Sequence, residues 1–200
     1  MQPSITPTDT VSDRIKLPFN FDVAKMQAEV AAMNLGAFVY YDSLPLRSPA
    51  FMVDPAIPMP PPAEDFADGS WTDWLDTKAL KSAPYLQEVL QTFRDNCTVN
   101  LVRILRLAPG AVVKEHTDPT LGLQIEKSMI RLTIPIQVDA SVTFFLNDEP
   151  VPMKTGECWY LRLTDPHRVV NNSTDQRINM TIDVIPNEWV KSMILAHDQS

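Results

Sequence analysis

The sequence is poor in cysteine and in positive charge, and it has no long apolar run. Its two cysteines, Cys97 and Cys158, lack the Cys-x-x-Cys spacing of a redox or zinc motif, so we expect reduced, structural thiols. Seventeen Lys and Arg residues against 25 Asp and Glu give a net charge of -8, which argues against nucleic acid or an acidic membrane surface as a partner. No stretch approaches the roughly 18 apolar residues of a membrane span. No apolar leader segment follows Met1, so we expect a cytoplasmic protein.

The composition indicates one domain over residues 1–200, because 44% of the residues are hydrophobic and 21% are charged. We expect residues 1–96 to provide helical support, an edge strand and a proline-rich, lid-like loop. Residues 97–186 should form a β core, and residues 187–200 a C-terminal helix and tail.

The second half of the chain has the pattern of short β-strands. Apolar and polar residues alternate with a period of two from Met129 to Val138, and again from Arg177 to Val184. In the second run Arg177 shares a polar face with Asn179, Thr181 and Asp183. Turn signals separate these and other extended runs at intervals of about ten residues, which predicts a mostly β fold, a double-sheet barrel or jelly roll.

The first half has apolar residues at helical spacing. One such run follows Asn20 and the other follows Ser82 and Pro84, so we expect two amphipathic helices outside a sheet. Residues 36–41 look like an added edge strand, and residues 187–196 like a final helix. The helical positions are Val23, Met26, Val30 and Met33 in the first run, and Leu86, Val89, Leu90 and Phe93 in the second.

Residues 44–63 contain seven prolines, too many for a helix or a central strand. Loops of this length are often lids. The segment is either a flap over a pocket, with Trp71 and Trp74 behind it, or a surface connection.

Three residues carry the strongest chemical signal: His116, Asp118 and His167. Two imidazoles and one carboxylate are the set that holds ferrous iron on one face and leaves the other face open. Residues i and i+2 of a strand point to the same side, so His116 and Asp118 would face one point. The pair alone also fits a polar surface turn after Pro109 and Gly110, and the surrounding strands favour the metal.

Five segments in order within residues 97–186 together resemble the aspartyl/asparaginyl β-hydroxylase family. This family consists of iron(II)- and 2-oxoglutarate-dependent dioxygenases with a double-stranded β-helix, a jelly-roll or cupin-like core, and includes small bacterial members of the proline cis-4-hydroxylase type. The segments are His116-Thr117-Asp118, Ile130 to Ile136, Gly156 to Leu161, Pro166 to Asn171, and Arg177 to Asp183.

The resemblance implies roles for individual residues. The three metal candidates match the iron ligands, and Arg177 matches the arginine that pairs with the far carboxylate of 2-oxoglutarate. Arg131 matches a second arginine, which contacts either the cosubstrate or a substrate carboxylate. Thr133 stands where family members commonly carry histidine. Thr133, Trp159 and Tyr40 are the candidate substrate contacts.

The expected activity is therefore hydroxylation of an unactivated C–H bond in a free or modified amino acid or a small natural-product intermediate, with dioxygen consumed and succinate and CO2 released. One alternative is a metal cupin of another class, an isomerase or a cosubstrate-free dioxygenase, which has no need of Arg177. Another is a noncatalytic ligand-binding barrel, which would not bind iron. The sequence leaves open the substrate, the carbon oxidised, desaturation as an outcome, and the oligomeric state.

Overall fold

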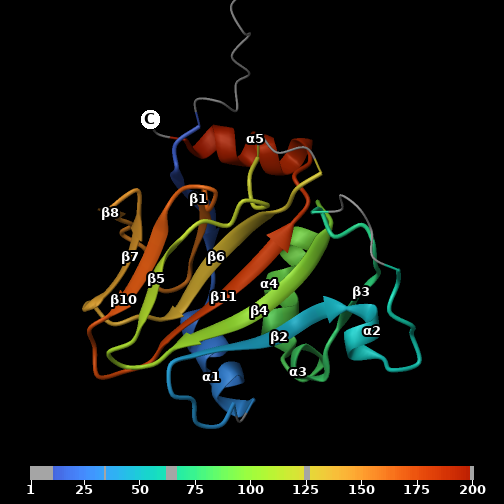
Figure 1. Ribbon diagram of the computed structural model, residues 1–200, viewed down its shortest axis with the longest axis horizontal. Coiled ribbons are helices and arrows are strands. Elements are labelled where there is room, and N and C mark those ends of the chain that lie inside the picture. Colours follow the sequence, from blue (N-terminus) through green and yellow to red (C-terminus); the bar gives the residue numbers. More distant parts are fainter. Residues whose placement is uncertain (1–10, 34, 62–66, 124–126, 199–200) are drawn as a thin grey trace, which may run out of the picture.

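In the computed structural model, residues 11–33, 35–61, 67–123 and 127–198 are described, and they form two antiparallel sheets that face each other (Figure 1). The larger sheet has seven strands in the order β1-β9-β6-β11-β4-β2-β3, and the smaller has four in the order β5-β10-β7-β8. This arrangement confirms the predicted jelly-roll core. The strands are β1 (Arg14–Asn20), β2 (Tyr41–Pro49), β3 (Trp74–Asp76), β4 (Val99–Leu107), β5 (Val112–His116), β6 (Ile130–Gln137), β7 (Val142–Leu146), β8 (Glu149–Pro150), β9 (Glu157–Leu161), β10 (His167–Asn171) and β11 (Arg177–Val184).

Helices cover the outer face of the larger sheet (Figure 1). Both predicted amphipathic helices are confirmed, and so is the C-terminal helix, which Asn187 caps by accepting a hydrogen bond from the backbone N–H of Val190. Their apolar residues join those of the sheet in one large buried cluster. The helices are α1 (Val23–Ala32), α2 (Ala50–Val53), α3 (Lys78–Lys81), α4 (Pro84–Arg94) and α5 (Glu188–His197).

The start of α4 is capped by a side chain from another helix. Ala83 occupies the N-cap position and has no side-chain acceptor. Glu29 of α1 supplies one instead, because its two carboxylate oxygens accept from the backbone N–H groups of Tyr85 at 2.7 Å and Leu86 at 2.9 Å. A carboxylate at a helix N-terminus satisfies unpaired donors and interacts favourably with the helix dipole. The contact thus joins α1 and α4 under the sheet.

Strand β11 has the two unlike faces that its alternation predicted, and every residue of it is buried. Ile178, Met180, Ile182 and Val184 belong to the apolar cluster beneath the helices. The polar residues face the opposite way, toward the smaller sheet. A strand buried on both sides can carry polar groups inward only where another group bonds them or a ligand site requires them.

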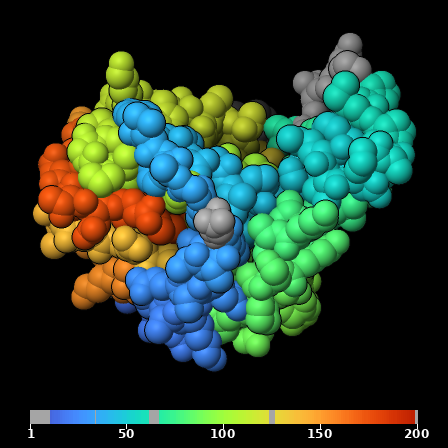
Figure 2. Space-filling model, turned by 90° about the horizontal axis from the view of Figure 1, so that it is seen from below, coloured from blue at the N-terminus to red at the C-terminus, as the bar shows by residue number. Residues whose placement is uncertain are grey.

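The predictions for residues 36–41 and 44–63 were wrong in their boundaries. The strand β2 begins at Tyr41, lies between β4 and β3, and includes Pro45, and α2 follows it directly. Proline is tolerated here because the register with β4 shifts between Pro45 and Arg47, and because β3 pairs only with Arg47 to Pro49. Residues 50–61, in cyan, project from the body of the molecule (Figure 2). Part of this segment, residues 62–66, lies outside the described residues.

Strand β1 was not predicted, although it pairs with β9 at the end of the larger sheet. Three of the seven strands therefore come from before residue 97. Within the described ranges, the structure contains no helix with the length and apolar character needed to cross a membrane.

Candidate metal centre

The two predicted histidine ligands lie side by side on paired strands of the smaller sheet. His116 at the end of β5 is the direct cross-strand partner of His167 at the start of β10, and their ring centroids are 4.2 Å apart. Asp118 follows β5, where its backbone N–H donates to the carbonyl of Leu163 at 2.8 Å. One ligand atom from each of the three side chains lies within 4.8 Å of the other two. Residues far apart in sequence thus converge on one point.

Backbone hydrogen bonds orient both imidazoles. The Nδ1 of His116 lies 2.8 Å from the carbonyl of Lys114, and the Nδ1 of His167 lies 3.0 Å from the carbonyl of Asp165. A carbonyl can only accept, so each Nδ1 is assigned the proton and each Nε2 keeps its lone pair for a metal. Burial lowers the pKa of His167, which favours the neutral form that binds metals.

The triad opens into a cavity of about 90 Å³ between the two sheets. Arg177 lines it at 6% exposure, and its guanidinium makes no ion pair or hydrogen bond with any described residue. Burial lowers the pKa of its guanidinium to about 10. Two oxygens beside it on β11, Asn179 Oδ1 and Thr181 Oγ1, are buried without a hydrogen-bond partner in the described part of the chain. The cavity therefore holds a cation and two polar groups that the described residues leave unsatisfied.

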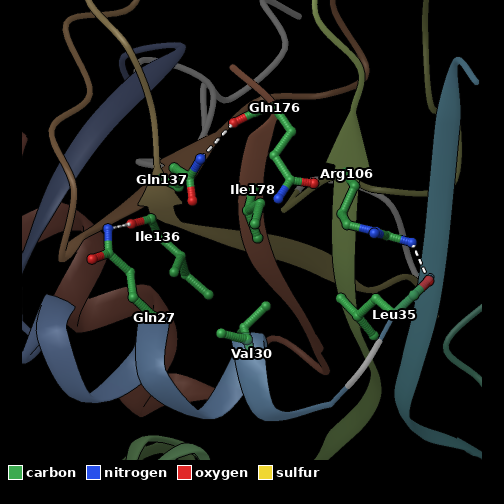
Figure 3. Close-up of a pocket in the computed structure, with 9 residues that line it drawn as sticks. Gln27, Val30, Leu35, Arg106, Ile136, Gln137, Gln176 and Ile178 are labelled. Atoms are coloured by element: carbon green, nitrogen blue, oxygen red, sulfur yellow. Dashed lines mark hydrogen bonds between the residues drawn. The ribbon is translucent and has the colours of Figure 1, made fainter. Parts of the chain in front are cut away.

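A larger cavity, about 170 Å³, lies on the opposite face of the same sheet beside α1 (Figure 3). Two of its glutamines are bonded to the chain: Gln27 donates to the carbonyl of Ile136, and Gln137 donates to the carbonyl of Gln176. Arg106 is paired with Asp42 there. This second cavity therefore has no unpaired charge to attract a ligand, and it has no group of metal-binding side chains among the described residues.

Sequence comparison places these features in a known family. The family model described as Aspartyl/Asparaginyl beta-hydroxylase matches residues 70–186, which include the triad and Arg177. The chain belongs to the aspartyl/asparaginyl β-hydroxylase family.

Two characterised relatives of this family member carry proline hydroxylase names. The L-proline cis-4-hydroxylase of Rhizobium meliloti is 29% identical over 109 residues, which cover 54% of this chain and 38% of that protein. The L-proline cis-3-hydroxylase 2 of a Streptomyces species is 29% identical over 125 residues, which cover 60% of this chain and 42% of that protein. The chain thus matches less than half the length of either relative.

Solved structures share the fold of this β-hydroxylase family member. A 2OG-Fe(II) oxygenase family oxidoreductase from Burkholderia pseudomallei has a TM-score of 0.54 at 12% identity, covering 86% of this chain and 84% of that one. The viral collagen prolyl hydroxylase of Paramecium Bursaria Chlorella virus-1 has a TM-score of 0.52 at 10% identity, covering 90% and 98%. At these identities the likeness concerns the fold.

The structure separates the predicted substrate contacts of this β-hydroxylase family member. Thr133 lines the cavity, on the same wall as Arg131 and Thr181. Tyr40 is 49% exposed and does not line it. Trp159 packs in a separate apolar cluster, and its indole N–H donates to Glu157 at 3.0 Å. Only Thr133 of the three is thus in a position to touch a ligand in this cavity.

Two residues near the site were missed at the level of sequence. Tyr41 lines the cavity, one position after the predicted Tyr40. Arg103 on β4 is the cross-strand partner of Thr181, and its Nε is buried with no hydrogen-bond partner among the described residues. Burial, followed by the nearby charge of Arg131, lowers the pKa of Arg103. The sequence held a signal for this placement. Residues three apart on a strand face opposite sides, so Arg103 and Arg106 cannot both lie on the helix-covered face of the sheet.

Arg131 is held by two carboxylates rather than facing the cavity alone. It bonds Asp183 with Nε at 2.7 Å and Nη2 at 2.9 Å, and it bonds Asp118 with Nη1 at 3.0 Å. Burial lowers the pKa of Arg131, but these carboxylates raise it by more, so the net pKa lies above its ordinary value. Arg131 is thus tied directly to the candidate metal ligand Asp118.

Proposed function

We propose that this protein is an iron(II)- and 2-oxoglutarate-dependent dioxygenase that hydroxylates an unactivated C–H bond of a free or modified amino acid, releasing succinate and CO2. The observation that carries the proposal is the shared cavity of the His116, Asp118 and His167 triad and Arg177, a buried cation without a partner among the described residues. A metal site alone explains the triad. A dicarboxylate cosubstrate explains the cation as well.

The donor set fits ferrous iron. Two imidazole Nε2 atoms and one carboxylate oxygen can occupy one face of an octahedral ion and leave three positions for other ligands. When bound, iron(II) with 2-oxoglutarate and dioxygen supplies the oxidant for C–H hydroxylation. The hydrogen bonds of the two Nδ1 atoms hold the rings in the required orientation.

Arg177 fits the far carboxylate of 2-oxoglutarate. A guanidinium makes two parallel charge-assisted hydrogen bonds to a carboxylate, which fixes both its position and its orientation. Asn179 Oδ1 accepts and Thr181 Oγ1 can donate, so both can bond a polar ligand or a water beside it. The cavity walls include Leu105 and Val113, which keep water away from the reacting atoms.

The opposite end of the cavity fits the carboxylate of an amino acid. Arg131 and Thr181 line the cavity there, and Arg103 is the cross-strand partner of Thr181. A spacing of about 3.3 Å per residue puts Thr181 roughly 13 Å along β11 from Arg177. The three arginines outnumber the carboxylates of Asp118 and Asp183, so this surface favours anionic ligands. The printed names of the two relatives support an amino-acid substrate and make L-proline the first candidate.

Anaerobic titration tests the cofactor assignment. We expect iron(II) and 2-oxoglutarate together to produce the visible charge-transfer band of a chelated keto acid in the wild-type protein. His167→Ala should remove the band by removing a ligand, while Arg177→Met should require a much higher 2-oxoglutarate concentration. A wild-type protein without the band, or a band that persists in His167→Ala, would contradict the proposal.

Substrate screening tests the reaction. Succinate release should depend on both 2-oxoglutarate and an amino acid, with L-proline and its ring homologues included in the panel. A metal cupin of another class would turn over without 2-oxoglutarate and would tolerate Arg177→Met. A noncatalytic barrel would release no succinate with any amino acid.

A further inference from the structure

Asp183 is a buried carboxylate close to the metal centre but outside its ligand set. Its exposed fraction is 1%, and both of its oxygens accept hydrogen bonds from Arg131, at 2.7 and 2.9 Å. The two residues are cross-strand partners on β11 and β6. The pair therefore has two rigid backbones behind it and a two-point contact that leaves the guanidinium little freedom to rotate.

The third contact of Arg131 gives this pair a direction. Nη1 donates to Asp118 Oδ2 at 3.0 Å. A guanidinium has five N–H donors in one plane, of which these contacts use three. Asp183 thus fixes the plane of the Arg131 guanidinium, which in turn bonds Oδ2 of Asp118. Oδ1 of Asp118 takes no part in the bond to Arg131.

We propose that Asp183 is a positioning residue that acts through Arg131 to hold Asp118 with one oxygen bonded and the other presented to the metal. The proposal rests on the proposed function, in which Asp118 is a metal ligand. Asp183 also neutralises a guanidinium that would otherwise place an uncompensated positive charge beside the cation. Orientation and charge both predict that loss of Asp183 weakens metal binding although Asp183 touches no metal.

A purely structural role for the pair predicts a different result. Buried ion pairs can often be replaced by apolar residues without loss of stability, whereas removing one partner costs stability. If Asp183 only balanced Arg131 within the fold, Asp183→Asn would lower thermal stability and leave the metal affinity of the folded fraction unchanged. Metal affinity therefore separates the two roles.

The test is a cobalt(II) titration followed by the visible absorption of the bound ion, with wild type, Asp183→Asn, Arg131→Met and the double variant. Partners that orient metal ligands typically contribute about 10- to 100-fold in affinity, and we expect each single variant to lose that much. If Asp183 acts through Arg131, the double variant should bind within about twofold of Arg131→Met, since residues in one chain of contacts are not additive.

Asp42→Asn is the matched control. It also breaks a pair between an aspartate and a buried arginine of the larger sheet, Arg106, but on the face away from the triad. Its cobalt(II) affinity and spectrum should equal those of wild type even though its melting temperature falls. If Asp183→Asn does not fold, Asp183→Glu keeps the charge but displaces the guanidinium, and it should show the same weakened binding.

The outcomes are distinguishable. Wild-type affinity in Asp183→Asn, or an Asp183→Asn effect that persists undiminished in the Arg131→Met background, overturns this inference and leaves the proposed function standing. Wild-type protein that binds no cobalt(II), or binds it equally well after His167→Ala, overturns the proposed function and this inference with it.

Discussion

Replacing Arg177 with methionine should have opposite effects on the two properties of the protein, stability and cosubstrate binding. Arg177 is 6% exposed, and its guanidinium has no ion pair or hydrogen bond with any described residue. A buried cation without a partner opposes folding, yet the same cation would pair with a dicarboxylate. Methionine has a similar length and no charge, so it removes the electrostatic cost and the ligand contact together.

The stability change can be worked from the pKa of Arg177. Burial lowers this pKa from 12.5 to about 10, so the unfolded chain holds the proton more tightly than the folded protein does. The resulting loss of folding free energy is fully present below the pKa of Arg177 in the folded protein, about 10. It disappears as the pH rises from about 10 toward the pKa of Arg177 in the unfolded chain. At about 1.4 kcal/mol per pH unit, the cation costs up to about 3 kcal/mol at pH 7. Arg177→Met should therefore raise the melting temperature of the metal-free protein by several degrees, at about 2–4 °C per kcal/mol.

The binding change has the opposite sign. Removing one partner of a buried, hydrogen-bonded charge pair costs about 2–5 kcal/mol, which is roughly a 30- to 5000-fold weaker affinity for 2-oxoglutarate. Thermal unfolding with cobalt(II), with and without 2-oxoglutarate, measures both quantities. Wild type should gain about 2.7 kcal/mol at a 2-oxoglutarate concentration one hundred times its dissociation constant. At the same concentration Arg177→Met should gain at most about 0.9 kcal/mol.

Arg106→Met is the control, because Arg106 is an equally buried arginine on the other face of the same sheet, at 5% exposure. It donates to Asp42 and to the carbonyl of Gly36, and also to the carbonyl of Leu35, a bond drawn in Figure 3. Losing these bonds should destabilise the protein by about 2–3 kcal/mol without reducing its response to 2-oxoglutarate. The reasoning is refuted if Arg177→Met lowers the melting temperature, or if it keeps a wild-type response to 2-oxoglutarate.

Two further predictions concern a helix cap, formed by Glu29, and a buried thiol, that of Cys97. Glu29→Gln removes the charge that caps α4 at Tyr85 and Leu86 and should lower stability by about 1 kcal/mol, seen as a drop of about 2–4 °C in melting temperature; an unchanged value would show that the cap contributes nothing. The other prediction concerns the Cys97 thiol, whose pKa burial raises from an ordinary 9.0 to about 11. Its thiolate fraction at pH 8 is therefore about a hundredfold lower than that of an exposed cysteine. Its rate of reaction with a disulfide reagent should rise about tenfold per pH unit up to pH 10. A rate that levels off near pH 9 would contradict this, and the buried Cys158 should stay unreactive while the protein is folded.

The sequence was sufficient where local periodicity reports the environment directly. The alternation in β11 identified both of its faces, and helical spacing identified α1 and α4. The spacing of His116 and Asp118 predicted a common direction, and the structure places His167 beside them. Apart from the position of His167, these features depend on neighbours in the chain, so a single sequence carries them.

The remainder depends on contacts between distant segments. β1 and β2 gain their stability from pairing with β9 and β4, which no local pattern encodes, and the prolines near β2 argued for a loop. Because β2 begins at Tyr41, Tyr41 lines the cavity in place of the predicted Tyr40. A shift of one residue reverses the face of a strand to which a side chain points. Alternation and the family resemblance singled out Arg177 in the sequence. That the Arg177 guanidinium and the Arg103 Nε have no partner among the described residues, whereas the donors of Arg106 are bonded, is visible only in the structure.

Strand β11 combines residues that stabilise the fold with residues that face the candidate site. One face of β11 is packed into the apolar cluster beneath the helices, so the strand is stabilised from that side while its polar face lies toward the cavity. That face is then free to carry groups that oppose folding, such as the unpaired Arg177, and groups that position others, such as Asp183. The polar residues of β11 alternate along the chain with the apolar residues Ile178, Met180, Ile182 and Val184. Each residue that faces the cavity is therefore next in sequence to a residue that packs in the core. Changes on the polar face should consequently alter binding more readily than they unfold the protein, and changes on the apolar face should do the reverse.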